Sequence, residues 1–218
     1  MSFDLNQLST PASASRKKYE VFISFRGEDT RKNFTTHLHT ALLQEKIETY
    51  IDDRLVRGDE IWPSLEVAVE ESQISVVIFS PNYASSSWCL DELVHVLDCK
   101  EKNNQIVIPV FYNVKTSDVR KQQGSYADAF VKLEERFNDK MIHKWRTALE
   151  TTSNLSGYDA SNTRNDIELI KTIVMDIIRK LNYSVPSSDH LKGLIGIENR
   201  IKELESLLFT GSSHARII

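Results

Sequence analysis

The chain has 218 residues, of which 40% are hydrophobic and 27% are charged. These values fit one globular domain with a substantial core and some length to spare. The formal net charge of -4 argues against a general nucleic-acid binder, which usually carries a surplus of basic residues.

The sequence gives no signal for secretion, a membrane or a metal centre. Residues 1–17 are rich in Ser, Thr, Ala and Pro without an apolar segment, so we expect a disordered tail and not a signal peptide. No stretch approaches the roughly 20 apolar residues of a membrane span. The two cysteines, Cys89 and Cys99, have no zinc-site spacing. We therefore expect a cytoplasmic or nuclear protein that holds no metal and has no membrane partner.

Strand and helix patterns alternate along residues 18–183, which we take as one domain. Apolar or β-branched segments predict four strands and a short fifth strand at an edge: Tyr19 to Phe25, Ile47 to Ile51, Ile74 to Phe79, Ile106 to Phe111 and Ser156 to Ala160. Helical spacing predicts the segments between and after them: 34–44, a helix with Pro63 in its first turn, 87–102, 125–137, 142–151 and 167–181. Such alternating units need right-handed crossovers. The pattern therefore predicts an α/β, flavodoxin-like stack, in which a five-stranded, mostly parallel sheet has helices on both faces.

Residues 184–218 follow a different pattern. Ser184 to Ser188 has the composition of a linker, and Leu191 to Leu208 has short helical spacing. The final Arg216 to Ile218 is typical of the start of a strand. We expect this segment to be a linker and the truncated start of a further domain in a longer protein.

Two polar motifs follow the first and third predicted strands. Arg26 to Arg31 comes directly after the first strand, and Ser86 to Leu93 follows the third. In an open parallel sheet, the loops at the carboxyl ends of neighbouring strands meet at one crevice. Two guanidinium groups and a carboxylate on a helix can then share a ligand. The combination predicts a site for an anionic nucleotide.

The candidate carboxylate lies on the helix that begins near Ser87. The expected buried stripe of this helix consists of Leu90, Leu93, Val94 and Leu97. This stripe leaves Trp88 and Glu92 one turn apart on the opposite face and turns Asp91 toward the flank. Exposed carboxylates are ordinary, so the spacing alone favours a solvated surface for Glu92. A large aromatic side chain beside it indicates the wall of a groove.

Several segments, in this order, resemble a plant Toll/interleukin-1 receptor homology (TIR) domain: Tyr19 to Arg31, Asp52 to Ile61, Ser87 to Leu93, Pro109 to Tyr112 and Asn154 to Gly157. The resemblance covers residues 18–183, and it is to the TIR domains of nucleotide-binding leucine-rich-repeat disease-resistance receptors. Residues 191–198 resemble the link from such a domain into the nucleotide-binding module. The implied fold is the TIR fold.

The resemblance implies an NAD+ nucleosidase that self-associates and cleaves the nicotinamide–ribose bond, with ADP-ribose-derived products that signal defence and cell death. The nicotinamide of NAD+ is already cationic and leaves without a proton. The enzyme therefore mainly stabilises an oxocarbenium-like ribosyl centre, for which one placed carboxylate is enough and no metal or cofactor is needed. By its place in the family motif, that carboxylate is Glu92.

The predicted substrate contacts come from both motifs and from the loop after the second strand: Arg26, Gly27, Arg31, Asp52, Arg57 and Trp88. Guanidinium groups give bidentate contacts to phosphate oxygens, and Gly27 allows a tight turn beside the ligand. The alternative for Arg26 is an ion pair with Glu28 or Asp29 that shapes the turn. The resemblance makes the loop after the second strand a flap. Val56 stands there where many relatives have a second basic residue, which leaves the choice between NAD+ and NADP+ open.

The resemblance also implies association with other copies of this domain and with other TIR domains. In the plant family, a hydroxyl residue and a histidine on the first helix contribute to one interface, and Thr36 and His37 stand there in this chain. Gly124 precedes the helix implicated in a second interface. The alternative for His37 is an ordinary surface histidine.

Two other functions are consistent with the fold class. A catalytically silent adaptor acts only through association, and we would favour it if Glu92 were missing. A phosphoacceptor receiver needs an aspartate after the third strand, where this chain has Ser80 to Asn82. We therefore set the receiver aside, while other nucleotides, including nucleic-acid ends, stay open as substrates.

Overall fold

The computed structural model describes residues 17–51, 61–160 and 165–183. Its strands are β1 (Tyr19–Phe25), β2 (Thr49–Ile51), β3 (Ser72–Phe79), β4 (Ile106–Phe111) and β5 (Tyr158–Asp159). They form one sheet in the order β2-β1-β3-β4-β5, and every neighbouring pair is parallel. The predicted five-stranded α/β fold is confirmed. The strand order reverses between β1 and β3, which is where an open parallel sheet offers its ligand crevice.

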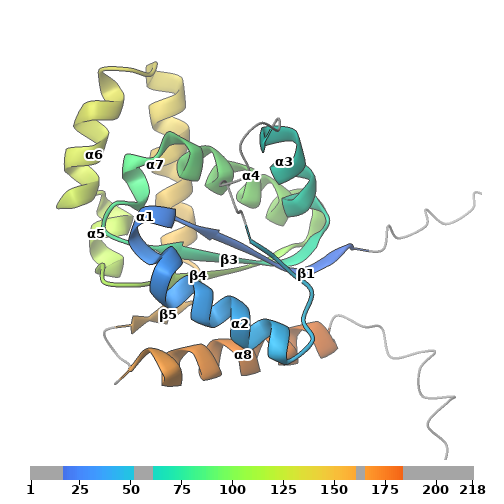
Figure 1. The fold of residues 1–218 in the computed structure, drawn as a ribbon. Helices are drawn as coiled ribbons and strands as arrows, with labels where there is room; N and C mark the ends of the chain where they lie inside the picture. The colour runs from blue at the N-terminus through green and yellow to red at the C-terminus, as the bar shows by residue number, and fades with distance from the viewer. Residues whose placement is uncertain (1–16, 52–60, 161–164, 184–218) are drawn as a thin grey trace, which may run out of the picture. The chain divides into compact units, whose positions relative to one another are not determined.

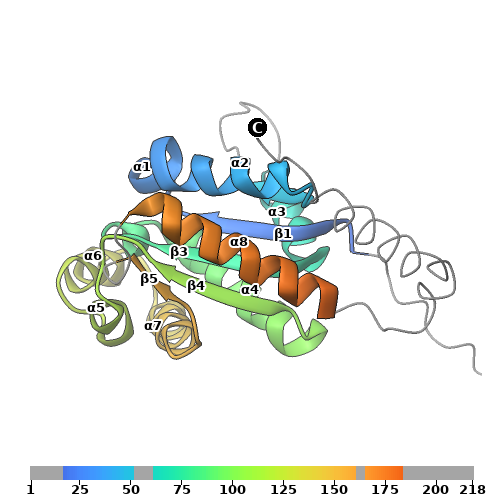
Figure 2. The same cartoon turned by 90° about the horizontal axis from the view of Figure 1, so that it is seen from below.

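Helices cover both faces of this sheet. They are α1 (Gly27–Thr30), α2 (Thr36–Gln44), α3 (Ile61–Glu70), α4 (Ser87–Asn103), α5 (Thr116–Lys121), α6 (Ser125–Glu134), α7 (Asp139–Ser153) and α8 (Asp166–Tyr183), with a kinked segment η1 (Arg31–Thr35) and a short turn η2 (Tyr83–Ser85). Figure 1 shows α3, α4 and α7 on one face of the sheet and α2 and α8 on the other. Seen from below in Figure 2, α2 and α8 both lie across that second face.

Each face of the sheet has a hydrophobic core. The strands contribute to both, because side chains alternate between the two faces of a strand. Phe22 and Val77 belong to the core that includes Leu90 of α4 and Trp145 of α7. Their neighbour Val76, also fully buried, points to the opposite face, toward α2 and α8. A sheet covered on both faces needs nearly continuous apolar strands, as β3 has.

The structure differs from the predicted elements at several places, including β3, which begins earlier, at Ser72, and β5, which keeps only Tyr158–Asp159. The second strand is shorter than predicted and keeps only Thr49–Ile51. The short helix α5 was not predicted from the sequence, because six residues are too few for a periodic pattern. The first long helix begins after η1, where Asn33 departs from helical geometry (φ -134°, ψ -105°).

The chain divides into two units, Met1–Ile178 and Arg179–Ile218. The sheet and its helices belong to the first unit, and the described part of the second is Arg179–Tyr183 at the end of α8. The predicted tail up to residue 16 and the predicted linker and further domain at 184–218 lie outside the described residues, so this division stays a prediction. No helix in the described ranges has the length and apolar content to cross a membrane.

Candidate functional site

The loops after β1 and β3 are joined directly. The backbone N–H of Asn82 donates to one carboxylate oxygen of Asp29 at 2.9 Å, and the Asn82 side-chain amide donates to the other at 3.1 Å. Asp29 belongs to α1, which follows β1, and Asn82 follows β3. The convergence predicted for these loops is therefore present. This bidentate clamp was not predicted from the sequence, because its partners are 53 residues apart.

Arg26 lies between β1 and α1, and its side chain is held by a residue of the same turn. Its Nη2 lies 2.6 Å from a carboxylate oxygen of Glu28, which is the ion pair considered as the alternative to a phosphate contact. The Nε of Arg26 is buried and has no hydrogen-bond partner among the described residues. A buried N–H without a partner costs free energy, so this atom is a donor available to an anionic ligand.

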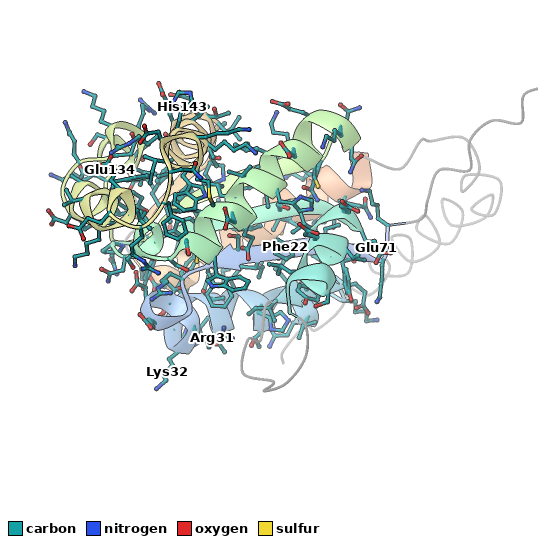
Figure 3. The ribbon with its side chains drawn as sticks, turned by 90° about the horizontal axis from the view of Figure 1, so that it is seen from above. Phe22, Arg31, Lys32, Glu71, Glu134 and His143 are labelled. Atoms are coloured by element: carbon teal, nitrogen blue, oxygen red, sulfur yellow. The ribbon has the colours of Figure 1, made fainter. Side chains whose placement is uncertain are left out.

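Arg31 lies over the ring of Phe25, with its guanidinium carbon 4.9 Å from the ring centre. A side chain at Gly27 would place Cβ 3.2 Å from the Nε and Nη2 atoms of Arg31. The chain turns tightly at Gly27, where the backbone N–H groups of Asp29 and Thr30 donate to the carbonyl oxygen of Arg26, but Gly27 has no positive φ, so this turn does not itself require glycine. The lack of a side chain at Gly27 instead makes room for the guanidinium. Figure 3 shows Arg31 at the α1 and α2 side of the molecule, with Lys32 projecting outwards.

Glu92 is buried, and the predicted outward orientation was wrong. Only 2% of Glu92 is exposed, whereas Trp88 one turn earlier is 50% exposed. Of the predicted stripe, Leu90 and Leu93 are fully buried, while Val94 and Leu97 are only partly buried. The reason is that α4 contacts α3 and α7 as well as the sheet, which buries a wider arc of the helix than a single stripe.

The charge of Glu92 contributes to raising the pKa values of two tyrosines, Tyr50 and Tyr83. Burial is the main cause that raises the pKa of Tyr50 in β2, and the charge of Glu92 raises it further. Burial likewise raises the pKa of Tyr83 in η2 well above its usual value, with added contributions from Cys89 and Glu92. Both phenols therefore stay neutral at neutral pH. Because only 2% of Glu92 is exposed, its carboxylate lies in an enclosed region of low dielectric constant.

The neighbouring carboxylate, Asp91, has a structural partner. The indole N–H of Trp145, which is only 1% exposed, donates to Asp91 Oδ1 at 2.8 Å. Burial raises the pKa of Asp91, and the hydrogen bond from Trp145 works against this shift. Asp91 thus fastens α4 to α7, which separates its role from that of Glu92.

Asp52 and Arg57, predicted to contact substrate, lie outside the described residues. No group of three or more His, Cys, Asp or Glu side chains in the described ranges is arranged to hold a metal ion. The expectation of no metal and no cofactor stays a prediction.

The predicted association residues lie at two surfaces. Thr36 and His37 are exposed at the start of α2, and the Thr36 hydroxyl donates to the carbonyl oxygen of Arg31. His37 lines a groove of about 470 Å³ between α2 and α8, where Ile167 is 66% exposed and Met175 is 52% exposed. Gly124 lies at the other surface, at the start of α6, and has a positive φ of 57°.

The geometry thus defines a class: an open parallel α/β domain with a candidate nucleotide site after β1 and β3. Residues 18–197 match the TIR domain family. The chain is 46% identical over 210 residues to "Disease resistance protein RPV1" of Vitis rotundifolia, covering 96% of this chain and 15% of that protein. It is 43% identical over 214 residues to "TMV resistance protein N" of Nicotiana glutinosa, covering 97% of this chain and 18% of that protein.

A solved structure agrees with these sequence relatives. The TIR domains in the structure of the activated Roq1 resistosome, which directly recognises the pathogen effector XopQ, are 48% identical with a TM-score of 0.69. The match covers 73% of this chain and 99% of that chain. The chain therefore belongs to the TIR domain family and is similar to the TIR domains of plant disease-resistance proteins. It spans less than a fifth of the length of the two curated relatives above.

Proposed function

We propose that this TIR domain is an NAD+ nucleosidase in a plant immune receptor of the cytoplasm or nucleus, and that self-association activates it. The observation that carries the proposal is the burial of Glu92 on α4, next to the half-exposed Trp88. Burying a carboxylate costs free energy, and such groups gather at functional sites. The names of the relatives support a role in disease resistance.

In the proposed reaction, the bond between C1′ of the ribose and the nicotinamide nitrogen breaks, and its electron pair neutralises the departing ring. The positive charge that develops at C1′ is stabilised by the Glu92 carboxylate in its enclosed region, where electrostatic interactions are stronger than in water. Water then adds at C1′ and releases a proton. The Nε of Arg26 and the guanidinium of Arg31 would bind the phosphates.

The test is to incubate NAD+ with dilute protein and with protein clustered on a multivalent scaffold, and to separate the products by chromatography. We expect nicotinamide and an ADP-ribose product from the clustered protein and little from the dilute protein. A parallel incubation with NADP+ measures the preference that the sequence leaves open. If light scattering shows assembly while NAD+ stays intact, the enzyme proposal fails and the silent adaptor takes its place.

The self-association that we propose uses the groove between α2 and α8. Exposed Ile167 and Met175 give this groove an apolar lining, and His37 lies in it. An apolar surface of this kind is a candidate for contact with another copy of the domain. The Roq1 structure supports this proposal because its TIR domains occur in an assembly.

Replacing His37 by alanine is expected to weaken self-association about tenfold, because a hot-spot side chain in an interface contributes on the order of 1 kcal/mol or more. The measurement is the mass from light scattering over a range of concentrations. His143→Ala is the matched control, since His143 is an exposed histidine on α7, on the other side of the molecule in Figure 3. Equal masses for the parent and His37→Ala at every concentration would exclude His37 from the interface.

A further inference from the structure

A buried relay of hydrogen bonds joins the end of β1 to the first turn of α4. Ser24 Oγ lies 2.9 Å from the hydroxyl oxygen of Tyr83, and that hydroxyl lies 3.1 Å from the carbonyl oxygen of Cys89. Ser24 and Tyr83 are 0% exposed and Cys89 is 2% exposed. A carbonyl only accepts, so Tyr83 donates its single proton to Cys89, and Ser24 must donate to Tyr83.

Two more contacts hold the same residue of α4. The thiol of Cys89 lies 3.7 Å from the carbonyl oxygen of Phe25, and the backbone N–H of Cys89 donates to Ser86 Oγ at 3.3 Å. The first turn of α4 is therefore tied both to its own cap and to β1. Each bond is modest alone, but buried polar groups are costly to separate once they are paired.

The position of Cys89 determines where Glu92 points. Residues three apart in a helix lie on the same face, so a helix that turns Cys89 toward β1 also turns Glu92 inward. On the other side of the relay, Ser24 and Phe25 directly precede Arg26. The relay therefore links the backbone that carries Arg26 to the helix that carries Glu92. One direct contact and a two-bond relay through Tyr83 of η2 leave little freedom for α4 to rotate against β1.

We propose that Tyr83, together with Ser24, is a positioning residue that fixes Glu92 relative to the substrate-binding end of β1. The catalytic part of this proposal rests on the proposed role of Glu92. No direct contact of Tyr83 with substrate is required. Loss of the relay would let α4 shift, and a shift of about 1 Å at a reacting group can lower a rate about a hundredfold.

The first test replaces Tyr83 by phenylalanine, which removes only the hydroxyl. Tyr126→Phe is the matched control, because Tyr126 is also 0% exposed and its hydroxyl donates to a carbonyl, that of Ser80, at 3.0 Å. With clustered protein, we expect Tyr83→Phe to lower kcat about tenfold to a hundredfold and to leave KM for NAD+ within about twofold. Tyr126→Phe is expected to keep kcat within about twofold of the parent value. Its loss of thermal stability should be similar to that of Tyr83→Phe, because each variant loses one buried hydroxyl group.

A second test needs no enzyme activity. Cys89 and Cys99 are both buried in α4, so a thiol reagent reaches each one only when the helix opens locally. We expect Tyr83→Phe and Ser24→Ala each to speed labelling of Cys89 about fivefold to tenfold, without changing the labelling rate of Cys99. The double variant should label no faster than Tyr83→Phe alone, because one broken link already interrupts the relay.

The two tests separate the possible failures. Faster Cys89 labelling with a lower kcat supports the proposal. A second outcome is that Cys89 is labelled faster in Tyr83→Phe but the parent protein releases no nicotinamide. This outcome supports the role of the relay in holding α4 and rejects the proposed NAD+ activity. Unchanged Cys89 labelling, or an unchanged kcat in Tyr83→Phe with an active parent, overturns the positioning role.

Discussion

Replacing Glu92 by glutamine is expected to lower nicotinamide release from clustered protein about a thousandfold. Removing a single preorganised charge or donor from an active site has effects of this order. Glutamine keeps the shape of glutamate and removes the negative charge that would stabilise the ribosyl cation. The measurement is the rate of nicotinamide release at saturating NAD+, with the assembly state of each protein checked by light scattering.

Asp91→Asn is the matched control for this substitution. It also exchanges a carboxylate for an amide on α4, and the asparagine oxygen can still accept the hydrogen bond from Trp145. We expect its rate to stay within about twofold of the parent. A Glu92→Gln protein that keeps more than a tenth of the parent's rate would place the catalytic carboxylate elsewhere. Loss of activity in both variants would point to a shared effect on α4.

Glutamine at position 92 should not unfold the domain. With 2% of its surface exposed, Glu92 is buried, and a neutral amide costs less to bury than a carboxylate. We expect the same circular dichroism spectrum and a thermal midpoint no more than about 3 °C below that of the parent. This pattern, in which activity is lost without loss of folding, distinguishes a functional carboxylate from a structural one.

The strands were predictable because burial on both faces demands nearly continuous apolar sequence. The bounds predicted for β1 and β4 are those of the structure. The edges were harder, since β2 and β5 have only 3 and 2 residues and pair on one side only. Short edge strands carry little apolar pattern, so their ends depend on tertiary pairing that local sequence does not encode.

The orientation of α4 shows where reasoning from one helix fails. A helical wheel assumes one buried stripe and treats the rest as solvated. The contacts of α4 with α3, α7 and the sheet come from segments distant in the sequence, and together they bury Glu92. The Trp145 bond to Asp91 has the same origin, because its partners are 54 residues apart. The local ion pair of Arg26 with Glu28 was foreseeable because its partners are two residues apart.

Gly157 is the position at which a single methyl group is expected to cost the most stability. It directly precedes β5, whose residues Tyr158 and Asp159 pair with Val110 and Phe111 of β4. A Cβ atom at Gly157 would lie 2.2 Å from the carbonyl oxygen of Pro109 and 2.6 Å from its Cγ. The contact is with backbone and a rigid ring, neither of which can turn away, so β5 must move from β4.

Gly157→Ala is therefore expected to destabilise the domain by about 3 kcal/mol, at the upper end of the usual cost of overpacking. For a domain of this size, that change lowers the thermal midpoint by roughly 6 to 12 °C. The measurement is thermal unfolding of the purified protein followed by circular dichroism.

Two other glycines supply controls with the same substitution and different physical causes. Gly124→Ala meets no atom within 4 Å but keeps a φ of 57°, so we expect a loss of about 1 kcal/mol from backbone strain alone. Gly27→Ala meets only the flexible end of Arg31 at 3.2 Å, and alanine favours the helix that begins there, so we expect a change of less than about 1 kcal/mol. The losses should therefore rank Gly157 above Gly124 and Gly124 above Gly27. A thermal midpoint for Gly157→Ala within about 2 °C of the parent would mean that β5 is not held against Pro109, and the register of the fifth strand would then need revision.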